Sequence, residues 1–189
     1  MKIKSLSIIT MISLCMLGCN MKSNKPEIKD ESDNAILVTY FSASGVTREA
    51  AINLGKATHA DLEEIRPEQP YSEADLDWRN DQSRSIVEMR DDSARPAFEE
   101  MDVEMDDYNT IYIGFPIWCN TYPKIIATFI ESNNLKGKTL IPFATSGSSG
   151  IEAACEDLKK AYPDLNWKPG ILLNGKTKEE IAQMFGKSK

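Results

Sequence analysis

Short, nearly continuous apolar runs alternate along the chain with stretches in which apolar side chains recur at helical spacing. The strongest runs are residues 35–41, 110–115 and 139–144, and weaker ones lie at 61–66 and 170–173. Helical spacing predicts helices over 46–58, 123–132, 151–162 and 178–185. Continuous apolar strands are typical of parallel sheets buried on both faces. We therefore expect an α/β fold with a five-stranded parallel sheet, helices on both faces and right-handed crossovers.

The connection between the second and third predicted strands, residues 66–108, is far longer than a usual loop. It contains three prolines and few large apolar side chains. Ser72 and Asp75 have the spacing of a capping pair that opens a helix. We expect a helix and a partly ordered excursion here, with a functional role.

The N-terminus has the pattern of an export signal. Lys2 and Lys4 precede an uncharged, mostly apolar run over 5–17, which is shorter than the roughly 20 residues that span a bilayer. The run ends at Gly18-Cys19, which resembles the lipidation site of bacterial lipoproteins. We expect a signal peptide over 1–18, a disordered polar tether over 19–34 and one domain over 35–189, exported and lipid-anchored to a bacterial envelope membrane through Cys19. An ordinary signal peptide that contains a cysteine is the alternative.

The composition argues against several classes of ligand and partner. The formal net charge of −7 argues against nucleic acid as a partner and against electrostatic binding to an anionic membrane. The single histidine, His59, excludes most zinc sites, and we expect it to face solvent. The acidic cluster over 99–107 lacks the spacing of a calcium loop, so we expect a solvated face and no metal site.

Three segments rich in small residues, 42–47, 116–121 and 145–150, follow the first, third and fourth predicted strands. Parallel sheets bind ligands at the carboxyl ends of their strands. In the first segment, hydroxyl side chains and Gly45 lead into a helix N-terminus, an arrangement that favours a phosphate. No lysine is present there, which suits a terminal monophosphate better than a nucleoside triphosphate. A plain hydroxyl-capped helix is the alternative.

The other two segments suit a flat ligand. Trp118 directly follows a buried strand, where an indole can stack on an aromatic ring or simply belong to the core. The Gly/Ser segment over 145–150 can approach a ring edge or be a flexible turn. A serine hydrolase is excluded because Gly-x-Ser-x-Gly is not present and His59 precedes these serines.

Taken in this order, the segments resemble flavodoxins. The matching segments are Tyr-Phe-Ser-Ala-Ser-Gly-Val-Thr at 40–47, Gly-Phe-Pro-Ile-Trp at 114–118 and Phe-Ala-Thr-Ser-Gly-Ser-Ser-Gly at 143–150. The long insertion fits a subfamily with a Gly-Tyr-Pro-Ile-Trp signature, through Pro70-Tyr71, Arg84, Glu88 and Arg95-Pro96. The resemblance covers roughly 35–185. It implies the sheet order 2-1-3-4-5 and FMN as the cofactor.

The resemblance also implies the contacts with FMN. The phosphate would be held by Ser42, Ser44, Gly45, Val46 and Thr47. One side of the isoalloxazine would be lined by Pro116, Ile117, Trp118 and Cys119, and the other edge by Thr145, Ser146, Gly147 and Gly150.

Two departures from the family pattern stand out. Cys119-Asn120 replaces a loop that often contains glycine beside flavin N5, and a positive φ is harder for cysteine than for asparagine. If Cys119 must adopt it, we expect a lean toward two-electron transfer. The loop over 145–150 also lacks the aromatic residue of many flavodoxins, so the second ring face is either open or covered by Tyr71 or Trp78.

The leading hypothesis is an FMN-binding protein that transfers electrons at the bacterial envelope to or from a redox partner protein. The alternative is an FMN-dependent NAD(P)H:quinone or nitro-compound reductase. A third hypothesis is a flavodoxin fold that has lost FMN and serves as a binding module. No residue in the sequence is required as a catalytic acid or base, and the donor, the acceptor and the oligomeric state stay open.

Overall fold

The computed structural model describes residues 35–185 of the 189-residue chain. Its strands are β1 (Ile36–Tyr40), β2 (Asp61–Glu64), β3 (Thr110–Pro116), β4 (Thr139–Thr145), β5 (Asn166–Trp167) and β6 (Ile171–Leu172). Its helices are α1 (Val46–Thr58), α2 (Arg84–Arg90), α3 (Lys124–Ser132), α4 (Glu152–Ala161) and α5 (Lys178–Phe185). Two single 3₁₀ turns, η1 (Ala74–Leu76) and η2 (Met105–Asp107), complete the elements.

All strand pairs are parallel, and the order β2-β1-β3-β4-β5 confirms the predicted topology. The fifth position of the sheet is divided between two short strands. β5 pairs with the first two residues of β4, and β6 pairs with Phe143 and Ala144 further along. Pro169 lies in the gap, where it has no N–H to donate to β4. The sequence predicted one strand at 170–173 and missed β5, because two residues form no apolar run.

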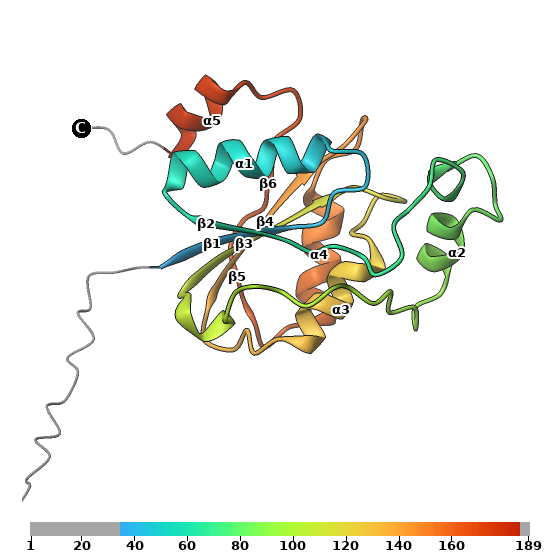
Figure 1. Cartoon of the computed structure of the whole chain (residues 1–189), viewed down its shortest axis with the longest axis horizontal. Coiled ribbons are helices and arrows are strands. Elements are labelled where there is room, and N and C mark those ends of the chain that lie inside the picture. The colour runs from blue at the N-terminus through green and yellow to red at the C-terminus, as the bar shows by residue number, and fades with distance from the viewer. Residues whose placement is uncertain (1–34, 186–189) are drawn as a thin grey trace, which may run out of the picture. The chain divides into compact units, whose positions relative to one another are not determined.

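The sheet is buried on both faces, which explains the continuous apolar runs (Figure 1). Alternate strand residues such as Leu37, Ile111 and Leu140 pack in one core with α3 and α4. Their neighbours, such as Val38 and Phe143, pack in a second core with α1 and α5. The three central strands β1, β3 and β4 therefore contribute to both cores, and the buried Thr39 in the middle of β1 is a polar exception.

The insertion between β2 and β3 is a long loop whose two ends pair with each other. Its base is a two-rung antiparallel pairing, in which Glu68 N–H donates to the Ala97 carbonyl (3.1 Å) and Glu99 N–H to the Arg66 carbonyl (2.8 Å). The Ser72–Asp75 pair forms the predicted reciprocal hydrogen bonds but opens only the 3₁₀ turn η1. The helix of the insertion is α2, which begins at residue 84, so the sequence placed the helix too early.

Several expectations concern residues that the structure does not describe. The signal peptide over 1–18, the tether over 19–34 and the lipidation site Cys19 all lie outside residues 35–185. Within those residues, none of the helices has the length and apolar character needed to cross a membrane.

Gly114 provides a test of the core. A Cβ atom at this position would lie 2.1 Å from the ring of Phe143, its register partner on β4. Since that ring is fully buried, Gly114→Ala should lower the free energy of unfolding by about 1–3 kcal/mol, measured by chemical denaturation. The matched control is Gly55→Ala inside α1, where a Cβ makes ordinary contacts no closer than 3.6 Å and helix propensity improves. Equal stabilities of the two variants would show that the Phe143 ring moves aside at no cost.

Candidate functional site

The three predicted loops meet at the carboxyl edge of the sheet, and Thr145 joins them. Its hydroxyl lies 2.8 Å from the hydroxyl of Thr47, which is 98 residues away in the sequence. Its carbonyl accepts the N–H of Ile117 at 2.9 Å. Both threonines are buried, so these polar contacts are shielded from water. The loops after β1, β3 and β4 are thereby held as one unit.

The first loop, residues 42–47, ends at the N-terminus of α1. Ser42 Oγ accepts the backbone N–H groups of Gly45 and Arg48, each at 3.1 Å, and its own proton is left to donate. The N–H groups of Val46 and Thr47 are the first of the helix and have no intrahelical acceptor. Gly45 has φ +90° and open space around its Cβ position. These donors form a cradle that suits one anionic group.

The positive charge that would attract this anion comes from peptide dipoles rather than from a cationic side chain. Residues 42–47 contain no basic side chain, and the adjacent Arg48 is held by Glu64 at 2.6 Å. The N-terminus of α1 carries a partial positive charge of about half a unit. The donor set suits a terminal phosphate bound without a metal, and phosphate binding at 42–47 stays a prediction. Ser44, exposed in the same loop, adds a further hydroxyl near the cradle.

The second loop contains a tight two-residue turn. Trp118 and Thr121 exchange both backbone hydrogen bonds, at 3.0 and 2.9 Å, around Cys119 and Asn120. Both central residues have positive φ, +47° for Cys119 and +66° for Asn120, as in a type I′ turn. The sequence left open which of the two would be left-handed, and the structure shows that both are. The conformation of Cys119 costs on the order of 1 kcal/mol and places its side chain on the surface.

Trp118 lies at the rim of the core rather than inside it. Its indole is half-buried and packs edge-on against Phe41 and Tyr71, with ring centroids 5.5 and 5.3 Å away. These near-perpendicular contacts are the geometry that aromatic quadrupoles favour. The indole is thus held from one side by two rings while another part of it stays accessible.

A small ionic cluster from the insertion holds Tyr71 in place. Its hydroxyl donates to Glu88 at 2.5 Å, while Arg84 binds the same carboxylate at 2.6 Å and lies 4.1 Å over the Tyr71 ring. Burial and the Glu88 carboxylate raise the pKa of Tyr71, so the phenol stays protonated and remains a donor. The insertion therefore supports Trp118 from behind.

The third loop, residues 145–150, is fixed by a residue that sequence reasoning missed. Asn174, just after β6, accepts the N–H of Ser146 and donates to its carbonyl. Ser146 Oγ in turn accepts the N–H groups of Ser148 and Ser149, at 3.2 and 2.9 Å. Asn174 thus substitutes for a strand neighbour beyond the end of β6. The only local signal is an Asn-Gly pair after a short apolar run.

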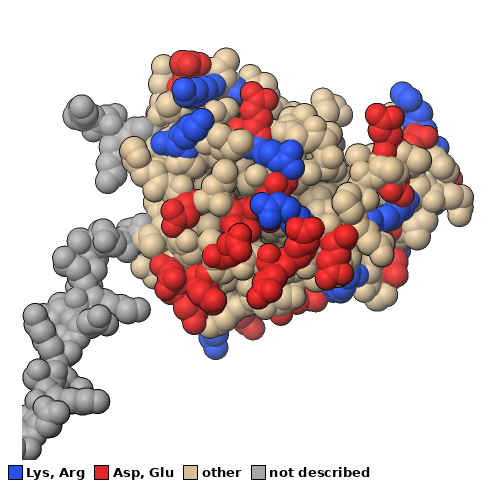
Figure 2. Space-filling view, viewed as in Figure 1, with Lys and Arg blue, Asp and Glu red and all other residues tan. Residues whose placement is uncertain are grey.

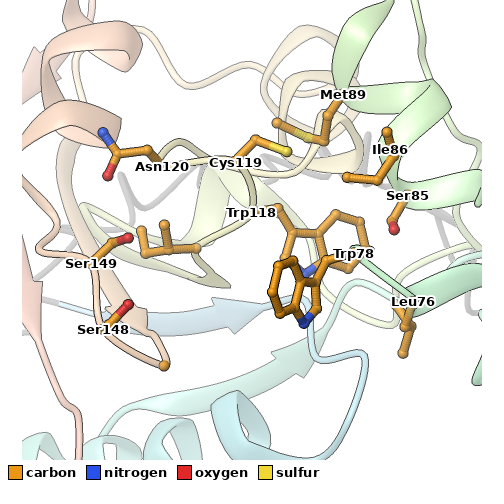
Figure 3. Close-up of a pocket in the computed structure, with 12 residues that line it drawn as sticks. Leu76, Trp78, Ser85, Ile86, Met89, Trp118, Cys119, Asn120, Ser148 and Ser149 are labelled. Atoms are coloured by element: carbon orange, nitrogen blue, oxygen red, sulfur yellow. The ribbon is translucent and has the colours of Figure 1, made fainter. Parts of the chain in front are cut away.

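A cavity of about 550 Å³ opens between the second loop, the third loop and the insertion (Figure 3). Its predicted site residues are Ile117, Trp118, Cys119 and Gly147. The sequence also placed Trp78 and Asn120 near the ring, and Ser148 and Ser149 belong to the predicted third loop. The lining residues that sequence reasoning missed are Leu76, Ser85, Ile86 and Met89. Trp78 is therefore in the cavity wall and Tyr71 is not. Pro116, Thr145, Ser146, Gly150 and the loop over 42–47 lie outside this wall.

Charge is distributed unevenly around the domain. Figure 2 shows acidic side chains gathered over β2 and the segment before β3, and the exposed members of the 99–107 cluster belong to this face. No group of three or more His, Cys, Asp or Glu residues suited to a metal ion occurs within 35–185. His59 is exposed, as expected, and Cys119 and Cys155 are both free thiols.

Comparison with known proteins gives a consistent set of matches. A family model described as flavodoxin matches residues 35–188. Solved structures of candidate flavoproteins from Bacteroides uniformis and Bacteroides eggerthii are both 50% identical to this chain, cover 80% of it, are themselves covered to 97% and 96%, and give TM-scores of 0.78 and 0.75. A flavoprotein from Lactobacillus acidophilus in complex with FMN shares the fold at 20% identity, covering 74% of this chain and 93% of its own, with a TM-score of 0.60. No curated protein sequence is significantly similar to this chain.

The role of Asn174 can be tested directly. Asn174→Ala removes both hydrogen bonds to Ser146, so backbone amides over 145–150 should exchange with deuterium about tenfold faster. Asn166→Ala is the matched control, because that side chain is exposed and donates a hydrogen bond to Thr139 at the opposite end of β4. Unchanged exchange in the third loop of Asn174→Ala would mean that the Thr145 contacts and the Ser146 hydroxyl fix this loop without Asn174.

Proposed function

The chain belongs to the flavodoxin family, and we propose that it is a redox protein that binds FMN across the loops after β1, β3 and β4. The observation that carries this proposal is the cradle at the start of α1, where N–H groups and the Ser42 hydroxyl converge on a position that suits one phosphate. The FMN complex of the Lactobacillus acidophilus flavoprotein, which shares the fold, supports FMN as the flavin.

In this proposal each loop has a separate task. The residues at 42–47 bind the terminal phosphate, and Gly45 lets the backbone approach it closely. Trp118 offers its indole to the flat ring system, and the turn at Cys119 and Asn120 presents backbone groups at the ring edge. Asn174 orients the third loop against the other edge. The flavin supplies reversible uptake of electrons or hydride, and the protein supplies binding and orientation.

We further propose that the protein exchanges electrons at a bacterial envelope, anchored through a lipid on Cys19. The acidic face over β2 and the 99–107 segment supports a basic partner protein, because complementary charge accelerates diffusional encounter. An FMN-dependent NAD(P)H:quinone or nitro-compound reductase is the second candidate. The wall that the insertion adds to the cavity supports it, because this wall lies outside the three flavin loops and is mostly apolar, which suits a small aromatic substrate; its residues are Leu76, Trp78, Ser85, Ile86 and Met89.

Phosphate recognition predicts a large preference for FMN over riboflavin. Loss of the phosphate removes at least two charge-assisted hydrogen bonds of about 1.5 kcal/mol each, so riboflavin should bind on the order of 100-fold more weakly. Titration of the apoprotein with each flavin, followed by quenching of flavin fluorescence, measures both affinities. Equal affinities would place the phosphate outside the α1 cradle.

Gly45→Val should also weaken FMN binding at least tenfold, because a branched side chain excludes the phosphate from the backbone. The control is Gly137→Val, which has a similar positive φ (+81°, against +90° for Gly45) and open surroundings, but lies in the turn before β4. Both variants should lose stability through backbone strain, while only Gly45→Val should lose FMN affinity. An equal loss of FMN affinity in both would assign the effect to folding.

Lipid anchoring predicts that the wild-type protein fractionates with membranes and that Cys19→Ser does not, or accumulates with its signal uncleaved. Metabolic labelling with a fatty acid, followed by mass spectrometry of the mature N-terminus, identifies the modified residue. A soluble wild-type protein that is cleaved at another position would refute the anchor and leave the flavin proposal intact.

A further inference from the structure

The turn at Cys119 and Asn120 has a conformation that its own sequence does not favour. Both residues have positive φ, +47° and +66°, although neither is glycine (Figure 3). Two-residue turns of this kind usually contain Asn-Gly, Asp-Gly or Gly-Gly, because the side chain of an L-residue opposes positive φ. Such conformations persist where the surrounding structure imposes them, and they gather at functional sites. A contact from outside the turn should therefore impose its shape.

Thr121, which closes the turn, makes such a contact. Its backbone N–H and carbonyl pair with Trp118 at 2.9 and 3.0 Å, and its hydroxyl donates to the Asp157 carboxylate at 2.6 Å. This length is typical of an O–H···O⁻ hydrogen bond, which is about twice as strong as one between neutral groups. Asp157 lies 36 residues further along the chain, so the constraint comes from the tertiary structure.

The position of Asp157 is fixed because its helix, α4, is packed into the core. Ala154 and Leu158 on this helix are fully buried, and Ile151 at its N-cap is only 4% exposed. Asp157 itself faces solvent, so its charge is not withdrawn from water. The helix also begins directly after the third loop, residues 145–150. It therefore continues from one loop of the candidate site and, through Asp157, holds another.

The other contacts of the second loop do not reach the turn. Before it, the N–H of Ile117 donates to the Thr145 carbonyl, and after it the Tyr122 ring packs on Phe115 with centroids 6.3 Å apart. These contacts fix where the chain enters and leaves the turn. Among the described residues, the side chains of Cys119 and Asn120 form no hydrogen bond that could fix their backbone. The contact of Thr121 with Asp157 is thus the one that acts on the turn itself.

We infer that Asp157 is a positioning residue of the candidate site, which holds the Cys119–Asn120 turn in its left-handed form through Thr121. Asp157 does not line the cavity, so it acts only through this contact. The inference rests on the proposed function in one respect, because the turn faces the ring of the proposed flavin. Without the contact the turn relaxes, and the ring binds less tightly. The phosphate cradle lies on a different loop and is unaffected.

Hydrogen exchange in the full-length protein without flavin tests the contact. Asp157→Ala loses a charge-assisted bond, so the amide of Thr121 should exchange about tenfold faster. Thr121→Val keeps the branched shape without the hydroxyl and should give the same increase. The double variant should add nothing to either single change, because both remove one interaction. Asp157→Asn retains an oxygen acceptor and should restore most of the protection.

Glu156→Ala is the matched control. Glu156 is the exposed neighbour of Asp157 on α4, and within residues 35–185 its side chain forms no hydrogen bond or ion pair. This variant removes the same charge and introduces the same residue into the same helix. It should leave the exchange of the Thr121 amide unchanged.

Titration with FMN and with riboflavin connects the contact to the site. Asp157→Ala and Thr121→Val should weaken both flavins about fivefold, because the turn faces the ring that the two share. The preference for FMN over riboflavin should stay as in the wild type, and Glu156→Ala should change neither affinity. Thr121→Val removes no charge, so equal effects in the two variants exclude a changed electrostatic field as the cause.

Several results would overturn the inference. Unchanged Thr121 exchange in Asp157→Ala, or additive effects in the double variant, would show that the turn keeps its shape without this contact. Faster exchange with unchanged flavin affinities would show that the turn does not support the ring, and a loss confined to FMN would place the effect at the phosphate. If exchange becomes faster while the wild-type protein binds neither flavin, Asp157 still positions the turn and the proposed function is refuted.

Discussion

The buried contact between Thr145 and Thr47 is the interaction on which the candidate site depends. β3 and β4 run in register to their last residues, Pro116 and Thr145, so the loops that follow them begin at the same level of the sheet. The Thr145 carbonyl then holds the second loop and its hydroxyl holds the first. Removing one buried hydroxyl would leave the other unsatisfied, at a cost of about 1–3 kcal/mol. The site is therefore built on the rigid end of the sheet.

A locally positive cradle exists in a domain whose net charge is negative, and the two facts are compatible. The formal charge of −7 acts over the whole surface and is screened within about 10 Å at ordinary ionic strength. The dipole of α1 acts at contact distance, well inside that screening length. Pairing of Arg48 with Glu64 also matters, because it neutralises the cation that directly follows the loop in the sequence. Recognition of a phosphate there depends on the geometry of N–H groups, so it discriminates by shape as well as by charge.

The sequence predicted what is encoded locally. Helices α1 and α5 were placed at their observed ends, because their apolar spacing is regular and turn residues flank them. The parallel sheet could be predicted because its central strands face a core on each side, and this makes their sequences continuously apolar. Asn174 could not be found in this way, because it acts on Ser146, 28 residues earlier, through its amide group alone. The positive φ values of both Cys119 and Asn120 were also hidden, since the closing pair Trp118–Thr121 determines the turn and not the residues inside it.

The insertion shows why a long loop can be retained in a compact fold. Its polar cluster of Tyr71, Arg84 and Glu88 is largely withdrawn from water, and such a cluster contributes little net stability compared with apolar packing. Its geometric effect is larger, because the shared carboxylate fixes the Tyr71 ring against Trp118 and fixes the first turn of α2. The same short helix then presents its other residues to the cavity. One cluster thus connects the ring that packs against Trp118 with the helix that lines the cavity.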